Sequence, residues 1–208
     1  MKRLFFVFAC VLVLYAQNAN DIAQRTEARL RSLNSLQAEF VQTYYSSSVS
    51  APLVEKGRLY IQKPGWMRWD YTDPEKKTFL IKDSLYQEYY PEDKQLVQKS
   101  LSEEEGGVDM LGLLTGTRGI HDHYEVESTS FPTDNKNVHQ LKLIPREKDP
   151  DSYILLEVDA KTWLILKAVS FDWAGNKQEF QFSQIKGDIS LPKDTFELKL
   201  PPDVDIIK

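Results

Sequence analysis

Hydrophobic and polar residues alternate most regularly on either side of Lys63-Pro64-Gly65. Residues 57–62 and residues 66–71 each place apolar side chains at every second position. The apolar face of the second run consists of Met67, Trp69 and Tyr71. Period-two alternation interrupted by Pro-Gly is typical of a β-hairpin. Because this face is rich in aromatic residues, it favours a curved sheet that closes on a core or on an apolar ligand.

Strand-like patterns also cover most of the remaining chain. Residues 33–43 predict one strand before the hairpin, with Phe40 and Gln42 on the same face. The later strands are predicted at residues 78–81, 84–90, 95–98, 124–128, 138–145, 153–158, 163–170 and 177–185. Since turns separate these strands, the pattern predicts antiparallel pairing. Residues 153–156 and 163–166 are apolar on both faces, which predicts that the sheet is covered on both sides there.

Two stretches do not follow the strand pattern. From Ile22 to Leu33, residues suited to a core recur at the spacing of one helix face, which predicts an amphipathic helix capped by Asn20. Residues 102–119 mix leucines with glycines, and each glycine inside a helix costs about 1 kcal/mol relative to alanine. This stretch predicts a short, weak helix, which is either a mobile lid or a plug that closes one end of a barrel.

The N-terminus has the composition of a cleaved secretory signal peptide. Two basic residues precede an apolar run at residues 4–15, and Ala16 then leads into a polar stretch. The apolar run is too short to span a membrane. We therefore expect a signal peptide at residues 1–16 and a single mature domain at residues 17–208.

The chain's one cysteine, Cys10, lies inside this apolar run. Lipid attachment at Cys10 is the alternative to cleavage, but Phe8 is bulky for such a site and apolar residues follow where a lipoprotein usually turns polar. After cleavage the mature chain has no cysteine, so packing rather than disulfide bonds must stabilise it.

Composition and charge narrow the possible function classes. Hydrophobic residues make up 41% of the chain and aromatic residues 12%, which are values of a globular protein. The net charge is -5, and no basic block is present that could neutralise a phosphate backbone. Nucleic acid is therefore not an expected partner.

The sequence shows no convincing catalytic or metal-binding arrangement. A thiol nucleophile is excluded in the mature chain, and no nucleophile elbow or phosphate-binding loop is present. The carboxylates of Asp70, Asp73 and Glu75 flank a turn, where solvent solvates them. His121 and His123 would share one face of a strand, but no third ligand with matching spacing follows. We therefore expect no enzyme, no metal and no cofactor.

The hairpin residues also resemble a known family. The pattern Gly-x-Leu-x-x-x-(Arg/Lys)-Pro-x-x-x-Arg-Trp-x-Tyr-x-x-Pro is similar to that of the outer membrane lipoprotein carrier (LolA-like) proteins. The residues at its defined positions are Gly57, Leu59, Lys63, Pro64, Arg68, Trp69, Tyr71 and Pro74. Residues 33–42 and 196–206 are similar to the opening and closing phrases of the same family.

This resemblance implies a fold, a function and partners. The fold would be mainly β, an incomplete antiparallel barrel of about eleven strands with helices covering its mouth. The protein would be a monomeric periplasmic chaperone that shields the acyl chains of lipoproteins. It would receive them from a lipoprotein-releasing ABC transporter in the inner membrane and pass them to an outer-membrane acceptor. A sensor or regulator that binds a lipoprotein or protein segment, and a lipid-modifying enzyme, are the alternatives.

The resemblance also implies an apolar cavity on the concave side of the sheet. The side chains expected to line it are Met67, Trp69, Tyr71, Phe79, Ile81, Met110, Leu111, Leu114, Leu155, Ile165, Phe180 and Phe182. For each of them, ordinary core packing is the alternative. In the family, the basic residue before the proline hydrogen-bonds the lid backbone when the cavity is empty. Here it is Lys63, whose point charge makes a weaker latch than the planar fork of arginine, or which is simply an exposed turn lysine.

Overall fold

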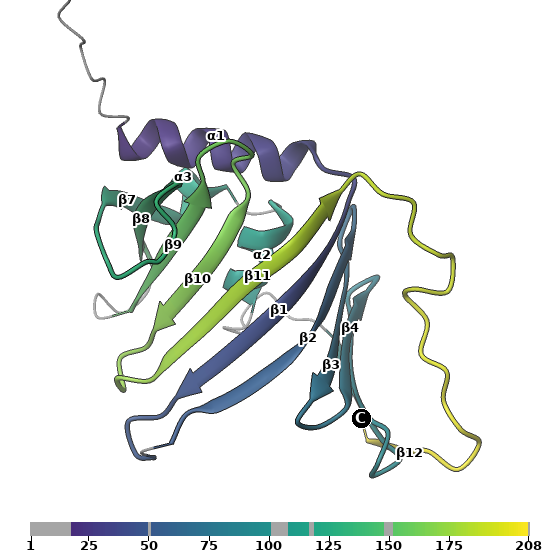
Figure 1. Cartoon of the computed structure of the whole chain (residues 1–208). Coiled ribbons are helices and arrows are strands. Elements are labelled where there is room, and N and C mark those ends of the chain that lie inside the picture. Colours follow the sequence, from purple (N-terminus) through teal and green to yellow (C-terminus); the bar gives the residue numbers. More distant parts are fainter. Residues whose placement is uncertain (1–17, 50, 101–107, 117–118, 148–151, 208) are drawn as a thin grey trace, which may run out of the picture.

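A single curved sheet of twelve strands forms the body of the protein (Figure 1). The computed structural model describes residues 18–49, 51–100, 108–116, 119–147 and 152–207. The helices are α1 (Ala19–Ser32), α2 (Val108–Thr115) and α3 (Ile120–His123). The strands are β1 (Ser35–Tyr45), β2 (Leu53–Gln62), β3 (Trp66–Asp73), β4 (Lys77–Lys82), β5 (Leu85–Tyr90), β6 (Gln95–Ser100), β7 (Tyr124–Ser128), β8 (Val138–Pro145), β9 (Tyr153–Asp159), β10 (Ile165–Phe171), β11 (Lys177–Gly187) and β12 (Asp205–Ile207).

The sheet is open rather than closed into a barrel. Its strand order is β12-β6-β5-β4-β3-β2-β1-β11-β10-β9-β8-β7, so two antiparallel meanders join where β1 pairs with β11. Only β12 runs parallel to its neighbour, β6, and it has three residues. The predicted mainly β fold with an incomplete antiparallel barrel of about eleven strands is confirmed. The sequence pattern did not indicate β12, because an alternation of apolar and polar residues cannot be recognised over three residues.

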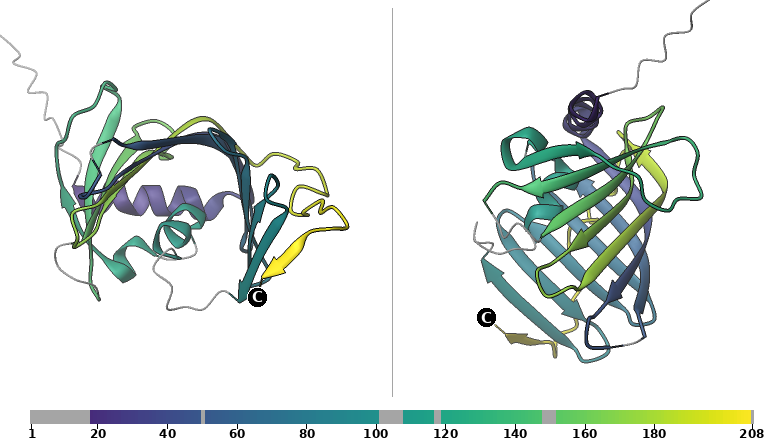
Figure 2. Two further views of the ribbon diagram at one scale, coloured as in Figure 1. Left: turned by 90° about the horizontal axis from the view of Figure 1, so that it is seen from below. Right: turned by 90° about the vertical axis from the view of Figure 1, so that its left-hand side faces the viewer.

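Figure 2 shows the sheet as an arch, with α1 across one end and α2 on the concave side. Every second residue of a strand faces this concave side, as the hairpin pattern predicted. In the β2–β3 pair, Leu59 lies opposite Trp69 and Ile61 lies opposite Met67, and all four side chains are buried. The hairpin around residues 63–65 and its buried face are therefore confirmed, although β2 begins four residues earlier and β3 ends two residues later than the predicted runs.

Helix α1 packs through the predicted stripe. Its residues Ile22, Thr26 and Leu30 are buried, and the Thr26 hydroxyl donates to the Ile22 carbonyl oxygen at 2.8 Å. The helix begins two residues earlier than the cap prediction, because Asn18, not Asn20, provides the N-cap side chain. An amphipathic helix lying on the edge of the core is confirmed.

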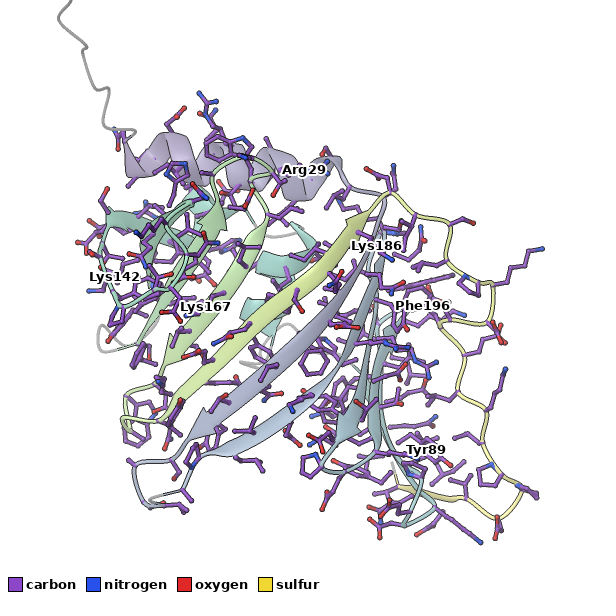
Figure 3. All side chains as sticks on the ribbon, in the orientation of Figure 1. Arg29, Tyr89, Lys142, Lys167, Lys186 and Phe196 are labelled. Carbon is purple, nitrogen blue, oxygen red and sulfur yellow. The ribbon has the colours of Figure 1, made fainter. Side chains whose placement is uncertain are left out.

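The segment between β11 and β12 crosses the convex face of the sheet (Figure 1). Its Phe196 points toward the sheet and is buried near Trp66, with ring centroids 5.6 Å apart (Figure 3). Arg68, on the convex face of β3, donates to the carbonyl oxygens of Thr195 at 2.9 Å and Glu197 at 3.0 Å. These contacts hold the C-terminal segment against the outside of the sheet.

Parts of the prediction lie outside the described residues. They are the signal peptide at residues 1–16, with Cys10, and the part of the glycine–leucine stretch outside residues 108–116. Within the described part of the chain, no helix has the length and apolar character needed to cross a bilayer.

Candidate functional site

The concave face of the sheet is lined by aromatic rings that contact one another. Phe40 from β1 lies edge-on to Trp69 and Tyr71 of β3, with centroid distances of 4.8 and 4.9 Å. Trp69 also lies 5.2 Å from Phe180 of β11. Aromatic pairs in this geometry add about 0.5–1.5 kcal/mol each beyond the burial of their area. The two meanders are therefore joined by ring contacts as well as by the β1–β11 ladder.

Most residues predicted to line the cavity lie together on this face. One buried cluster contains Met67, Trp69, Tyr71, Ile81, Leu114, Ile165, Phe180 and Phe182, and Phe79 packs against it half-buried. Met110 and Leu111 belong to α2, but their side chains lie outside the described set. These predicted lining residues are thus brought to one place from the four strands β3, β4, β10 and β11 and from α2.

Leu155 is the exception. It lies opposite Lys142 of β8 and Val169 of β10, whereas the core residues Leu156 and Ile154 point the other way. The side chain of Lys142, opposite Leu155, lies on this outer face (Figure 3). The expectation that Leu155 lines the concave side was therefore wrong. In a run that is apolar on both faces, alternation alone does not tell which face points inward.

A small apolar cavity of about 20 Å³ lies between the helices and the concave face of the sheet. Its lining residues are Leu30, Leu36, Ala38, Leu59, Ile61, Leu114, Leu164, Ile165, Phe182 and Ile185. A space of this size holds about one water molecule, so an acyl chain does not fit into this cavity as it stands. The cavity marks the place where α1 and α2 meet the concave face without filling it.

Lys63 attaches the hairpin to helix α1. Its Nζ donates to the carbonyl oxygens of Leu30 at 2.8 Å and Arg31 at 2.5 Å. These carbonyls belong to the last turn of α1, where a cation is also favoured by the helix dipole. Burial lowers the pKa of the Lys63 ammonium, while the charge of Asp188 opposes this shift.

The residue before proline therefore does bind helix backbone, but not the helix expected. We predicted that Lys63 would contact the glycine–leucine stretch, and it contacts α1 instead. The connection to α2 is indirect. A Cβ on Gly116, just after α2, would lie 3.1 Å from backbone atoms of Leu30 and Arg31, so the end of α2 packs closely on the end of α1.

Glu27 is a second link between the helices, and the sequence pattern did not indicate it. Its carboxylate accepts from the Ile120 backbone N–H at 2.8 Å and pairs with Arg31 at 2.7 Å. Ile120 is the first residue of α3, so Glu27 holds α3 to α1 across 93 residues of sequence. The sequence did not distinguish Glu27, because it is one of several charged residues on the polar side of the predicted helix.

A group of polar side chains interrupts the apolar concave face, and sequence reasoning missed it as well. Lys77 Nζ donates to Glu55 Oε1 at 2.5 Å, and the Tyr71 hydroxyl donates to Gln42 Oε1 at 2.5 Å. Glu55 and Gln42 are buried. The only sequence signal is a break in the apolar alternation at these positions, which a surface strand would show too.

A second hollow, of about 530 Å³, lies on the convex face beneath the C-terminal segment. Its lining includes the charged residues Arg68, Asp70, Lys76 and Lys199. Asp70, predicted to face solvent, pairs with Arg68 at 2.8 Å. This hollow therefore combines charged groups with apolar surface.

The two histidines weighed as metal ligands lie in α3, not on a strand. His121 Nδ1 is 3.8 Å from Glu27 Oε2. Among the residues that the structure describes, no group of three or more His, Cys, Asp or Glu side chains is arranged to hold a metal ion.

The sequence model of the outer membrane lipoprotein carrier protein LolA matches residues 31–199, which include every strand of the sheet except β12. The chain belongs to this family. The outer-membrane lipoprotein carrier protein of Methylococcus capsulatus is 26% identical over 93% of this chain and 91% of its own length. The protein of the same name from Chromobacterium violaceum is 25% identical over 91% of this chain and 88% of its own.

Solved structures share the fold of this LolA-family chain at low identity. An uncharacterised conserved protein from Thermus thermophilus has a TM-score of 0.58 at 14% identity, and the match covers 92% of this chain and 99% of that one. MucB has a TM-score of 0.52 at 17% identity, with 86% of this chain matched. The matched part is 62% of the MucB chain, so this chain spans less than two thirds of that protein. At such identities the likeness concerns the fold alone.

Proposed function

We propose that this protein carries acylated lipoproteins through the periplasm, with their acyl chains held between the concave face and the helices. The observation that carries the proposal is the apolar, aromatic concave face beneath helix α1, whose last turn Lys63 binds. Family membership supports a carrier role. The proposed lining is the set of predicted residues that the fold brings together, without Leu155.

The energetics favour a carrier of this kind. Each methylene removed from water is worth about 0.8 kcal/mol, so a sixteen-carbon acyl chain exposes on the order of 12 kcal/mol to water. A lipoprotein therefore needs its chains covered while it crosses an aqueous compartment. The protein must also release them, which favours a diffuse apolar contact over a deep specific pocket.

We infer that the helices move when a chain is loaded between them and the described part of the concave face. The rings of the concave face contact one another, and the cavity of about 20 Å³ is too small for a chain. Displacement of α1 and α2 from the sheet would open the space between Leu30, Leu114 and Phe182. The contacts of Lys63 with the end of α1 then stabilise the empty, closed form.

The rest of the proposed route follows the family. The chain would be exported by its N-terminal signal peptide and would act in the periplasm. An inner-membrane lipoprotein-releasing ABC transporter would supply the cargo, and an outer-membrane acceptor would take it. The protein would work as a monomer and without a cofactor.

The test is to purify the protein from the periplasm and identify bound molecules by mass spectrometry. The control is Phe171→Glu, because the wild-type Phe171 ring stacks on Tyr153 on the convex face, away from the cavity. We expect the wild type and this control to bind acylated proteins. Phe182→Glu, on the neighbouring strand but in the cavity lining, is expected to lose them, because a carboxylate there disfavours an acyl chain. Circular dichroism must show that both variants are folded. A wild type without any acylated cargo contradicts the proposal.

A sensor or regulator that binds a protein segment is the second candidate. Its support is the fold shared with MucB, which was also solved in complex with MucA from Pseudomonas aeruginosa, at a TM-score of 0.50. In the same experiment, a bound protein that carries no acyl group would favour this candidate over the carrier.

A further inference from the structure

A buried ion pair lies on the concave face, beside the aromatic rings. The side chains of Lys77 and Glu55 are 15% and 9% exposed, and their Nζ and Oε1 atoms are 2.5 Å apart. The Lys77 ammonium lies 4.6 Å from the centre of the Tyr71 ring and 5.6 Å from that of Phe79. Both rings belong to the predicted acyl-binding face, so the ion pair faces the same space.

Other polar groups extend the pair into a belt across the strands. Gln42 of β1 lies directly opposite Glu55 and accepts from the Tyr71 hydroxyl. Glu88 of β5 lies opposite Phe79 and accepts from the hydroxyls of Tyr86 and Tyr90. By the strand registers, these residues lie toward the ends of their strands that are remote from Ser35, the first residue of β1, which follows α1. We call Gln42, Glu55, Tyr71, Lys77 and Glu88 the polar belt.

Stability alone does not explain an ion pair in this position. A buried ion pair is often no more stabilising than a well-packed pair of apolar residues of similar size. Burial raises the pKa of the Tyr90 hydroxyl to about 12, and the neighbouring Glu88 carboxylate adds to this shift. The hydroxyls therefore stay neutral, and the belt offers hydrogen bonds within an otherwise apolar face.

We propose that the polar belt binds the ester and amide carbonyl groups that join acyl chains to the head of the cargo. This inference rests on the proposed carrier function and adds the substrate class to it. The acyl chains would lie along the rings towards α1, and their linkage would lie at Lys77. The carrier would thereby recognise a neutral acyl linkage, not only hydrocarbon.

The chemistry of the pair supports a neutral ligand. A lysine ammonium has three donors, and Glu55 occupies one of them, so further donors are available to a carbonyl oxygen. Glu55 neutralises the Lys77 charge, and Glu88 adds a negative charge nearby. A phosphate would gain little from Lys77 and would be repelled by both carboxylates. The belt therefore disfavours anionic phospholipids, although they carry the same chains.

The first test uses the mature wild-type protein with a fluorescent apolar dye bound. Three competitors of equal chain length displace the dye: a cysteinyl peptide with two ester-linked chains, its ether-linked analogue and phosphatidylglycerol. Because a hydrogen bond to a charged group is lost in the ether, we expect the ester peptide to bind about tenfold more tightly. It should also bind more tightly than phosphatidylglycerol. Equal affinity for the ester and ether peptides would overturn the inference.

The second test removes the charges with the double variant Glu55→Gln and Lys77→Met. The difference between ester and ether should disappear there. It should persist in the control Lys56→Met and Asp73→Asn, which removes an exposed ion pair from the neighbouring ends of β2 and β3. A difference that persists in the Glu55 and Lys77 variant would refute the role of the belt. If that variant does not fold, the wild-type comparison decides. If neither peptide displaces the dye, the carrier function itself is contradicted. If both displace it equally, only the role of the polar belt is contradicted.

Discussion

At the scale of single residues, two members of the hairpin motif have clear structural reasons. Gly57 lies where the ring of Phe40 crosses β2, and a Cβ there would come within 2.7 Å of that ring and 2.1 Å of the Asp70 carbonyl oxygen. Lys63 binds the end of α1. The glycine thus allows the aromatic face to pack, and the lysine connects that face to its helical cover.

We predict that Gly57→Ala lowers the free energy of unfolding by about 1–3 kcal/mol, because backbone atoms as well as a ring must shift to admit the methyl group. Urea denaturation of the mature protein measures this. Gly65→Ala is the control, since no atom lies within 4 Å of the added Cβ, and it should change stability by less than about 0.5 kcal/mol. Equal effects at both glycines would contradict this explanation.

We predict that Lys63→Leu leaves the domain folded and speeds amide hydrogen exchange in the last turn of α1 and in α2. The variant loses both hydrogen bonds to the Leu30 and Arg31 carbonyl oxygens. Lys63→Arg keeps the donors and should restore slow exchange. Unchanged exchange in Lys63→Leu across residues 28–33 and 108–114 would show that these bonds do not hold the helices.

At the scale of elements, α1 is the part to which the other helices are attached. Glu27 binds the first N–H of α3, Arg31 pairs with Glu27, and Gly116 packs α2 against Leu30. The helices are therefore expected to move as a connected group rather than one at a time. Two short contacts of Lys63 join that group to the hairpin.

Glu27→Ala should release α3 from α1, because the buried N–H of Ile120 then loses its acceptor. Loss of a bond to a charged group costs about 1.5–3 kcal/mol, so exchange of the Ile120 amide should rise by at least about tenfold. NMR-detected exchange measures it. Asp21→Ala removes the exposed pair with Arg25 on the same helix and should leave that amide unchanged. A comparable rise in both variants would contradict a specific role for Glu27.

At the scale of the whole molecule, the open sheet has different cover on its two faces. The helices lie on the concave side, and the C-terminal segment lies on the convex side of β3 to β6 (Figures 1 and 2). The buried residues Leu80, Leu96 and Phe196 do not belong to the concave core cluster. Movement of the helices therefore need not disturb the outer layer.

Arg68→Met should loosen the C-terminal segment while the concave face stays intact, because Arg68 donates to two of its carbonyl oxygens. Limited proteolysis should cut residues 188–204 several-fold faster than in the wild type, with dye binding unchanged. Arg58 is exposed on the neighbouring strand β2, so the control Arg58→Met should be cleaved at the same rate as the wild type. Unchanged cleavage in Arg68→Met would mean that apolar contacts such as Phe196 hold the segment without it.

The sequence by itself determined strands β1 to β11, the turns between them and the buried stripe of α1, because alternation and helical spacing are local properties that a few residues express. It also indicated which side chains share the concave face, since Trp69 and Phe180 lie on strands that are apolar on one face only. The tertiary structure alone decided that Leu155 faces outward, that Lys63 binds α1, and that Lys77 meets Glu55 on the concave face. These depend on sheet curvature and on contacts between residues far apart in the chain, about which local periodicity carries no information.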